Sequence, residues 1–180
     1  MPIPDFQSVM LPLLKYAATR DEVQMKDACL EMGKVFKVTS QEFKENLPSG
    51  RAKMFYNRVA WAKQYLAYAS LIEPVRRGVF RITKLGRKWA KENDSGIKIG
   101  DFKSIPGYEE RVRGKSSVDG KPSEAPVDVD LHETPEEQMQ SAYKQVRQRV
   151  IVELLARIIQ KPPEFFEAMV VAFIEEQPPQ

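Results

Sequence analysis

The chain has 180 residues and a mass of 20.7 kDa, enough for one ordinary domain or for a small domain with an appendage. Its hydrophobic fraction of 42% is sufficient for a buried core, and no apolar run approaches the roughly 18 residues of a membrane span. The single cysteine, Cys29, and the single histidine, His132, exclude an internal disulfide framework and an ordinary zinc site. The first ten residues lack a secretory signal, so we expect a cytoplasmic protein.

The net charge of +3 conceals an uneven distribution. Residues 1–47 have a net charge of −1, and residues 93–180 have a net charge of −5. Between them, residues 48–92 contain eleven Lys or Arg and two Asp or Glu, a net charge of +9. Such a concentrated basic block is typical of proteins that bind a polyanion, because neutralised phosphates release counterions. A solvated basic face without a ligand is the alternative.

Residues 4–92 show regular apolar periodicity and predict a first domain. Asp5 is suited to cap a helix that runs to about residue 17 and contains Pro12, where a kink or a later start is expected. A second helix is expected over about 23–36, with its apolar surface supplied by Val23, Ala28, Leu30, Met32 and Val35. Thr39 or Ser40 then caps a short third helix that stops before Pro48.

A long helix is predicted over about 50–70, with Ser49 as its cap. One face carries a core stripe at helical spacing, formed by Phe55, Val59, Ala62 and Leu66. The opposite face carries Lys53, Asn57, Ala60 and Gln64, and contains no acid. Asn, Gln and Lys side chains are suitable partners for base edges in a DNA major groove.

Two strands are predicted at 71–73 and 79–82, with Arg76, Arg77 and Gly78 near the turn between them. Thr83 then caps a closing helix. The whole order predicts a mainly α-helical fold with a small β-hairpin, a winged helix-turn-helix domain. In such domains the long helix enters the major groove. The hairpin arginines Arg76, Arg77 and Arg81 would then follow phosphates or the minor groove.

Residues 93–134 hold five of the nine glycines and little apolar surface, and we expect a flexible linker that is disordered from about residue 112. The piece FKSIPGY, 102–108, is expected to pack at its start. From 135 to 176 the sequence predicts a helical segment of two helices, broken at Pro162 and Pro163. Their apolar residues need a partner, and we expect a homodimer formed through these C-terminal helices.

Four stretches of the first domain occur together in a fixed order: IPDFQSVMLPLL at 3–14, LPSG at 47–50, FYNRVAWAKQYLAYASLIE at 55–73 and RRGVFRIT at 76–83. In this order and spacing they resemble the N-terminal domain of Mrr-type restriction proteins, which restrict modified DNA. The resemblance resumes at TPEE, AYKQVR and LLARI, and continues into PPEFFEAMVVAFIEE, which is similar to the opening helix of the family's nuclease domain.

The resemblance implies a winged-helix reader joined by a linker to a metal-dependent nuclease. That nuclease holds Mg²⁺ through an Asp and a Glu/Gln-x-Lys on adjacent strands. The sequence ends at Gln180, before such strands, so we expect this chain to need no cofactor and not to cut DNA alone. Glu167 matches an acid of the family's FFE segment, but has no metal-binding partners here. The tripeptide Glu42-Phe43-Lys44 lies in a helix-cap context and is interpreted as coincidence.

The predicted partner is double-stranded DNA, either methylated or unmethylated. The candidate DNA-binding residues are Arg51, Lys53, Asn57, Arg58, Gln64, Arg76, Arg77 and Arg81. For Arg58, pairing with Glu73 or with a backbone carbonyl is an equal alternative. Two other functions stay open: a small dimeric winged-helix transcription regulator, and a protein-interaction module whose basic face is incidental.

Overall fold

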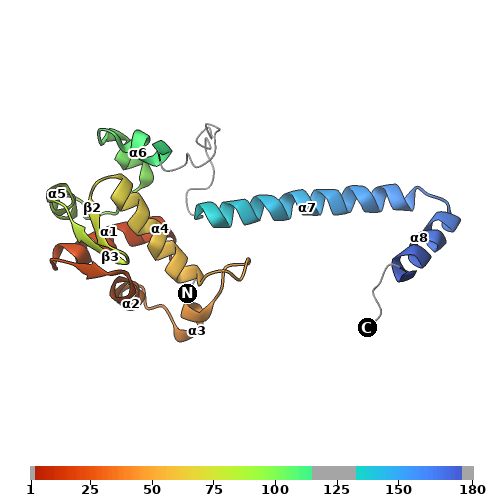
Figure 1. The fold of residues 1–180 in the computed structure, drawn as a ribbon, viewed down its shortest axis with the longest axis horizontal. Helices are drawn as coiled ribbons and strands as arrows, with labels where there is room; N and C mark the ends of the chain where they lie inside the picture. Colours follow the sequence, from red (N-terminus) through yellow and green to blue (C-terminus); the bar gives the residue numbers. More distant parts are fainter. Residues whose placement is uncertain (1–2, 115–132, 176–180) are drawn as a thin grey trace. The chain divides into compact units, whose positions relative to one another are not determined.

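A computed structural model describes residues 3–114 and 133–175 of the chain (Figure 1). The chain divides into two compact units, one that extends to Gln138 and one that begins at Met139. The disorder expected from about residue 112 concerns mainly residues 115–132, and this range, which includes His132, lies outside the described residues. Each unit is described by itself below.

The first unit begins with α1, Phe6–Ala18, followed by β1, Val23–Gln24, and α2, Met25–Val35. Next come the short α3, Ser40–Lys44, and the long α4, Met54–Tyr68. The hairpin strands β2, Ile72–Arg76, and β3, Val79–Ile82, lead into α5, Lys84–Glu92. The 3₁₀-helix η1, Ile99–Ser104, and α6, Tyr108–Gly114, close this part of the chain. The predicted winged-helix order is confirmed.

The caps of three helices follow the sequence prediction. The Asp5 carboxylate accepts hydrogen bonds from the backbone amides of Gln7 and Ser8, and α1 continues through Pro12. Thr39 caps α3 in a reciprocal capping box with Glu42, and the backbone hydrogen bond from Thr39 lowers the pKa of that carboxyl. The Glu-x-Lys tripeptide at 42–44 is therefore part of a helix cap. Thr83 caps α5.

The sheet is antiparallel and has the strand order β1-β3-β2, so the hairpin carries a third strand that the sequence analysis missed. Val23 pairs with Phe80 and Gln24 with Val79, which makes residues 23–24 extended where a helix was expected. The helix therefore starts only at Met25. Leu30 and Val35 of this helix are 51% and 53% exposed, so the expectation that they supply core surface is wrong.

The start of α4 also differs from the prediction. Residues 47–52 form a turn in which Leu47 donates to the Ala52 carbonyl and Gly50 has a φ of 70°. That positive φ suits glycine and interrupts any helix at this point. Ser49 accepts a hydrogen bond from the Arg51 amide inside this turn and caps no helix. The N-cap of α4 is Lys53.

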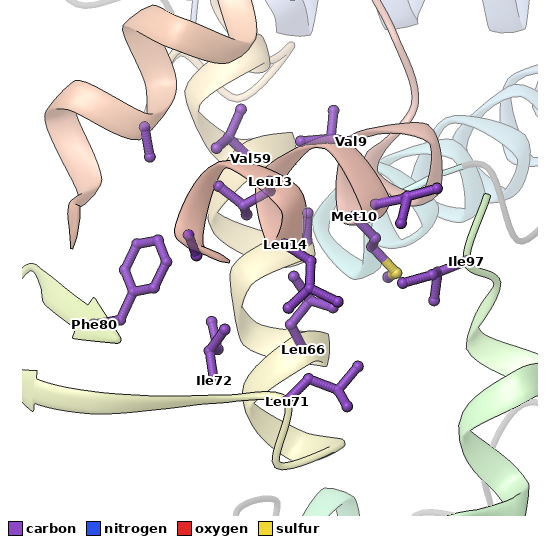
Figure 2. Packing of buried hydrophobic residues seen from close by; sticks show 14 of the residues in the cluster. Val9, Met10, Leu13, Leu14, Val59, Leu66, Leu71, Ile72, Phe80 and Ile97 are labelled. Carbon is purple, nitrogen blue, oxygen red and sulfur yellow. The ribbon is translucent and has the colours of Figure 1, made fainter. Parts of the chain in front are cut away.

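The core of the first unit lies between α1, α4 and the hairpin (Figure 2). The predicted stripe of α4 is fully buried, at Phe55, Val59, Ala62 and Leu66. Leu13 and Leu14 of α1 lie against it, and Phe80 and Ile72 close the side of the sheet (Figure 2). Cys29 is buried as expected, and burial raises the pKa of its thiol to about 11.

The predicted packing of the FKSIPGY segment is confirmed. Phe102 is fully buried, and Ile105 and Tyr108 are 9% and 6% exposed. The Phe102 ring contacts those of Trp89 and Tyr108. Part of the range assigned to a linker, 93–134, is thus folded onto the winged helix, with α6 packed beside α4 and η1 beside α6.

The second unit consists of most of α7, Pro135–Ile159, and of α8, Pro163–Glu175. The helix break falls at Pro162, as the sequence predicts. Large apolar side chains of this unit are exposed, for example Met139 at 69%, Tyr143 at 67% and Phe166 at 55%. No helix among the described residues is both long enough and apolar enough to cross a membrane.

Candidate nucleic-acid interface

Helix α4 has two covered sides and one free side. The core stripe lies on the first, and α6 and residues 133–137 contact the second. Tyr65 stacks on Phe6 at 5.4 Å between ring centroids, and burial raises the pKa of its phenol. Tyr65 is therefore a packing residue. The side chains that stay accessible lie along the third side, at Lys53, Tyr56, Ala60, Lys63 and Gln64.

The accessible side of α4 therefore differs from the predicted face, which was Lys53, Asn57, Ala60 and Gln64. Lys53 is exposed, and its Nζ donates to the Lys44 carbonyl at 2.8 Å, which holds the side chain at the start of the helix. Gln64 is half-buried. Asn57 is only 9% exposed, and its Nδ2 donates to the Glu136 carboxylate at 2.6 Å. The expectation that Asn57 faces solvent is wrong because residues 133–137 lie against that side of α4.

The β2–β3 hairpin lies beside α4 (Figure 1), and basic residues of both elements line one hollow. This hollow of about 360 Å³ is lined by Lys63 and Gln64 of α4 and by Arg76, Arg77 and Phe80 of the hairpin. Its apolar lining includes Ile72, Pro74 and Val79, and its cationic lining is formed by Lys63, Arg76 and Arg77. Gly78 at the hairpin turn has a φ of 77°, as its predicted role in the turn requires.

The hairpin arginines differ in their surroundings. The Arg76 side chain is 68% exposed, and its Nη2 lies 3.7 Å from Oε2 of Glu22. An exposed ion pair of this kind contributes little to stability. Arg77 is exposed and has no ion-pair partner in the part of the chain that the structure describes. Arg81 pairs with Glu73 directly across the strands β2 and β3. Arg76 and Arg77 are therefore the hairpin cations most available to a ligand.

Arg58 has a structural environment. Its Nε and Nη2 donate to one Glu137 oxygen at 3.0 and 2.8 Å, and its Nη1 donates to the carbonyls of Ile3 and Pro4 at 2.6 and 3.2 Å. The two side chains of the ion pair are 16% and 8% exposed. Of the alternatives for Arg58, the backbone carbonyls are found and the Glu73 pairing is not. Arg51 lies exposed in the turn before α4, so its DNA contact stays a prediction.

Two accessible residues of this surface were missed in the sequence analysis: Lys63, and Tyr56, which is 46% exposed. Both lie at helical spacing with Ala60, about 100° from the core stripe. The spacing alone could have identified this row. The coverage of Asn57, by contrast, depends on a segment about eighty residues further along the chain.

Among the described residues, no group of three or more His, Cys, Asp or Glu side chains is close enough to hold an ion. Glu167 lies exposed on α8. The Mg²⁺ expected for complete family members stays a prediction about those proteins.

Comparison with known proteins finds one family match and one relative. Residues 6–92 match the Mrr N-terminal domain family. The chain is similar to the type IV methyl-directed restriction enzyme EcoKMrr of Escherichia coli (strain K12), with 24% identity over 177 residues. That alignment covers 95% of this chain and 58% of the enzyme, so the chain spans little more than half the length of this relative. No solved structure matches the chain. The helices and the hairpin that frame the cationic hollow lie within the matched range, so the part of the chain that is similar to the Mrr N-terminal domain contains the whole of this surface.

Proposed function

We propose that this chain binds double-stranded DNA through α4 and the β2–β3 hairpin. The observation that carries the proposal is the cationic hollow, in which Lys63 and Gln64 of the helix face Arg76 and Arg77 of the hairpin. Cations on two elements can follow one phosphate backbone, while an amide between them can reach a base edge. The match to the Mrr N-terminal domain supports a role in a DNA restriction system.

The hairpin arginines provide the first test. We expect the double substitution Arg76→Ala/Arg77→Ala to weaken binding to a duplex about 10-fold at moderate salt, because two phosphate contacts are lost. Fluorescence anisotropy with a labelled duplex measures this. Lys84→Ala/Lys91→Ala removes the same charge from α5, where both lysines are exposed, and is the matched control. Equal losses in the two double variants would mean that only net charge matters and that the hairpin is not a contact site.

The DNA modification state is a separate proposal. The relative is named a methyl-directed restriction enzyme, and we propose that this chain prefers methylated duplexes. The apolar part of the lining of the hollow, from Ile72, Pro74 and Val79, is compatible with a methyl group. The same anisotropy assay with matched methylated and unmethylated duplexes tests this. Equal affinities would contradict the preference while leaving DNA binding intact.

The second unit supports a further proposal, a homodimer formed through α7 and α8. Exposed apolar side chains along α7, such as Val146, Val150 and Leu154, offer a surface that a second copy could bury. Two readers in one dimer would also suit two half-sites on DNA. Sedimentation equilibrium at micromolar concentration tests the dimer, and a monomer at every concentration would contradict it.

DNA cleavage is not part of the proposed role of this chain. We propose that the chain acts in the cytoplasm as the recognition part of an Mrr-like system, and that it does not cut DNA by itself. Incubation of supercoiled plasmid with the protein and Mg²⁺ tests the second point. The expected result is intact plasmid, and nicked or linear products would contradict it.

A further inference from the structure

The first turn of α7 lies against α4. Thr134 is fully buried and forms a capping box with Glu137: the Thr134 amide donates to the Glu137 carboxylate at 2.8 Å. The same carboxylate receives the Arg58 guanidinium. Glu136 accepts the hydrogen bond from Asn57. Two adjacent glutamates therefore hold residues 134–137, which we name the acidic turn, on two adjacent residues of α4.

The contact with the acidic turn satisfies only one of the two hydrogen-bonding groups of the Asn57 side chain. Its Nδ2 has Glu136 as a partner, but its buried Oδ1 has no hydrogen-bond donor among the described residues. A buried acceptor without a partner costs free energy. An exposed Asn offers a donor and an acceptor together, which is the pair of groups that binds an adenine edge in the major groove. The docked state therefore hides the one asparagine of α4 at the cost of an unsatisfied acceptor.

The negative charge of the acidic turn also disfavours DNA phosphates near the start of α4. Glu137 is neutralised by Arg58, but among the described residues the Glu136 carboxylate has only the neutral Asn57 amide as a hydrogen-bond partner and no cation. Glu133 adds another acid directly before the turn. Lys53 lies one helical turn before Asn57, on the accessible side of α4. A phosphate that approached Lys53 would be repelled by the uncompensated charge of Glu136.

We propose that the acidic turn is an intramolecular competitor of DNA for the N-terminal half of α4. The inference rests on the proposed DNA binding and adds a regulated site to it. When the acidic turn leaves, Asn57 gains both hydrogen-bonding groups, Arg58 becomes available for a phosphate, and the carboxylates move away from the interface. Release also returns the Glu137 carboxylate and the Arg58 guanidinium to water, which offsets part of the lost ion pair. By linkage, DNA favours release, and a weaker acidic turn favours DNA.

The substitution Glu136→Gln tests this in the full chain. The glutamine keeps an oxygen that can accept from Asn57 but removes the charge. We expect about five-fold tighter binding to duplex DNA. Glu164→Gln, at an exposed residue of α8, changes the net charge by the same amount and is expected to bind like the wild type. Equal thermal stability of the two variants shows that the fold is kept.

Amide hydrogen exchange provides the second readout. In the docked turn, the Glu137 amide donates to the Thr134 hydroxyl and the Gln138 amide donates to the Thr134 carbonyl. We expect DNA to speed exchange at Glu137 and Gln138, and the proposal requires this together with the affinity gain. Two results would contradict the proposed competition while leaving the proposed DNA binding intact. The first is DNA binding without a change in exchange at these amides, and the second is equal DNA affinity of Glu136→Gln and the wild type. Absence of DNA binding by every variant at low salt overturns both.

Discussion

Replacement of Gly86 by alanine is expected to lower the free energy of unfolding of the first unit by about 3 kcal/mol. Gly86 lies in the first turn of α5, where its amide donates to the Thr83 cap. A Cβ at this position would lie 2.0 Å from the carbonyl oxygen of Leu71 and 2.8 Å from an Ile82 side-chain carbon. The nearest obstacle is backbone, which cannot rotate away as a side chain can.

The clash would act on a junction of several elements. The Leu71 carbonyl accepts hydrogen bonds from both the amide and the hydroxyl of Thr83, which fixes the start of α5 against the strand β2. To admit a methyl group, α5 must move away and stretch these bonds. Differential scanning calorimetry should show a fall in Tm on the order of 10 °C.

Gly100 provides the matched control. It lies in η1, and a Cβ there would meet nothing within 4 Å. Gly100→Ala is expected to change stability by less than about 1 kcal/mol, because it mainly restricts the unfolded chain. If the Tm of Gly86→Ala equals that of Gly100→Ala, the close approach of α5 to Leu71 is not present in solution.

Substitution of Arg58 by alanine is the second large effect, and we expect a loss of about 3 kcal/mol. The change would leave the Glu137 carboxylate, which is 8% exposed, without its cation. It would also remove the donor to the carbonyls of Ile3 and Pro4. An uncompensated buried charge is the largest of these costs. Urea denaturation of the full chain measures the loss.

Arg81→Ala is the matched control for Arg58→Ala. Arg81 also pairs with a glutamate, Glu73, but the two side chains are 55% and 47% exposed. Because solvent screens this pair, its loss should cost less than about 1 kcal/mol. Addition of Glu137→Ala to Arg58→Ala should recover part of the stability, since the unpaired carboxylate is then gone. Equal losses for Arg58→Ala and Arg81→Ala would contradict the buried network.

Local patterns predicted the elements of the winged helix well. The core stripe of α4 follows from spacing alone, and Asp5, Thr39 and Thr83 cap helices because their side chains satisfy free backbone amides. The hairpin turn was placed from Gly78 and its flanking arginines. In each case the deciding interactions lie within a few residues along the chain.

The errors arise where distant residues decide. Val23 and Gln24 become a strand because Phe80 and Val79 pair with them, some fifty-six residues later. Ser49 loses its cap role to the turn around Gly50. Asn57 and Arg58 were placed by helical angle on or beside a DNA-facing surface, but Glu136 and Glu137 cover them from a separation of 79 residues. Periodicity places a side chain on a helix and cannot show what covers it.

The central claim is that α4 and the hairpin bind the DNA backbone, and its salt dependence tests it most directly. Anisotropy of a labelled duplex should be titrated with the wild-type protein and with Arg76→Ala/Arg77→Ala at several salt concentrations. The account predicts that the logarithm of affinity falls linearly with the logarithm of salt concentration, and that the double variant has a slope smaller by about 2. Binding that is insensitive to salt, or no binding at low salt, would contradict it and favour a protein-interaction module.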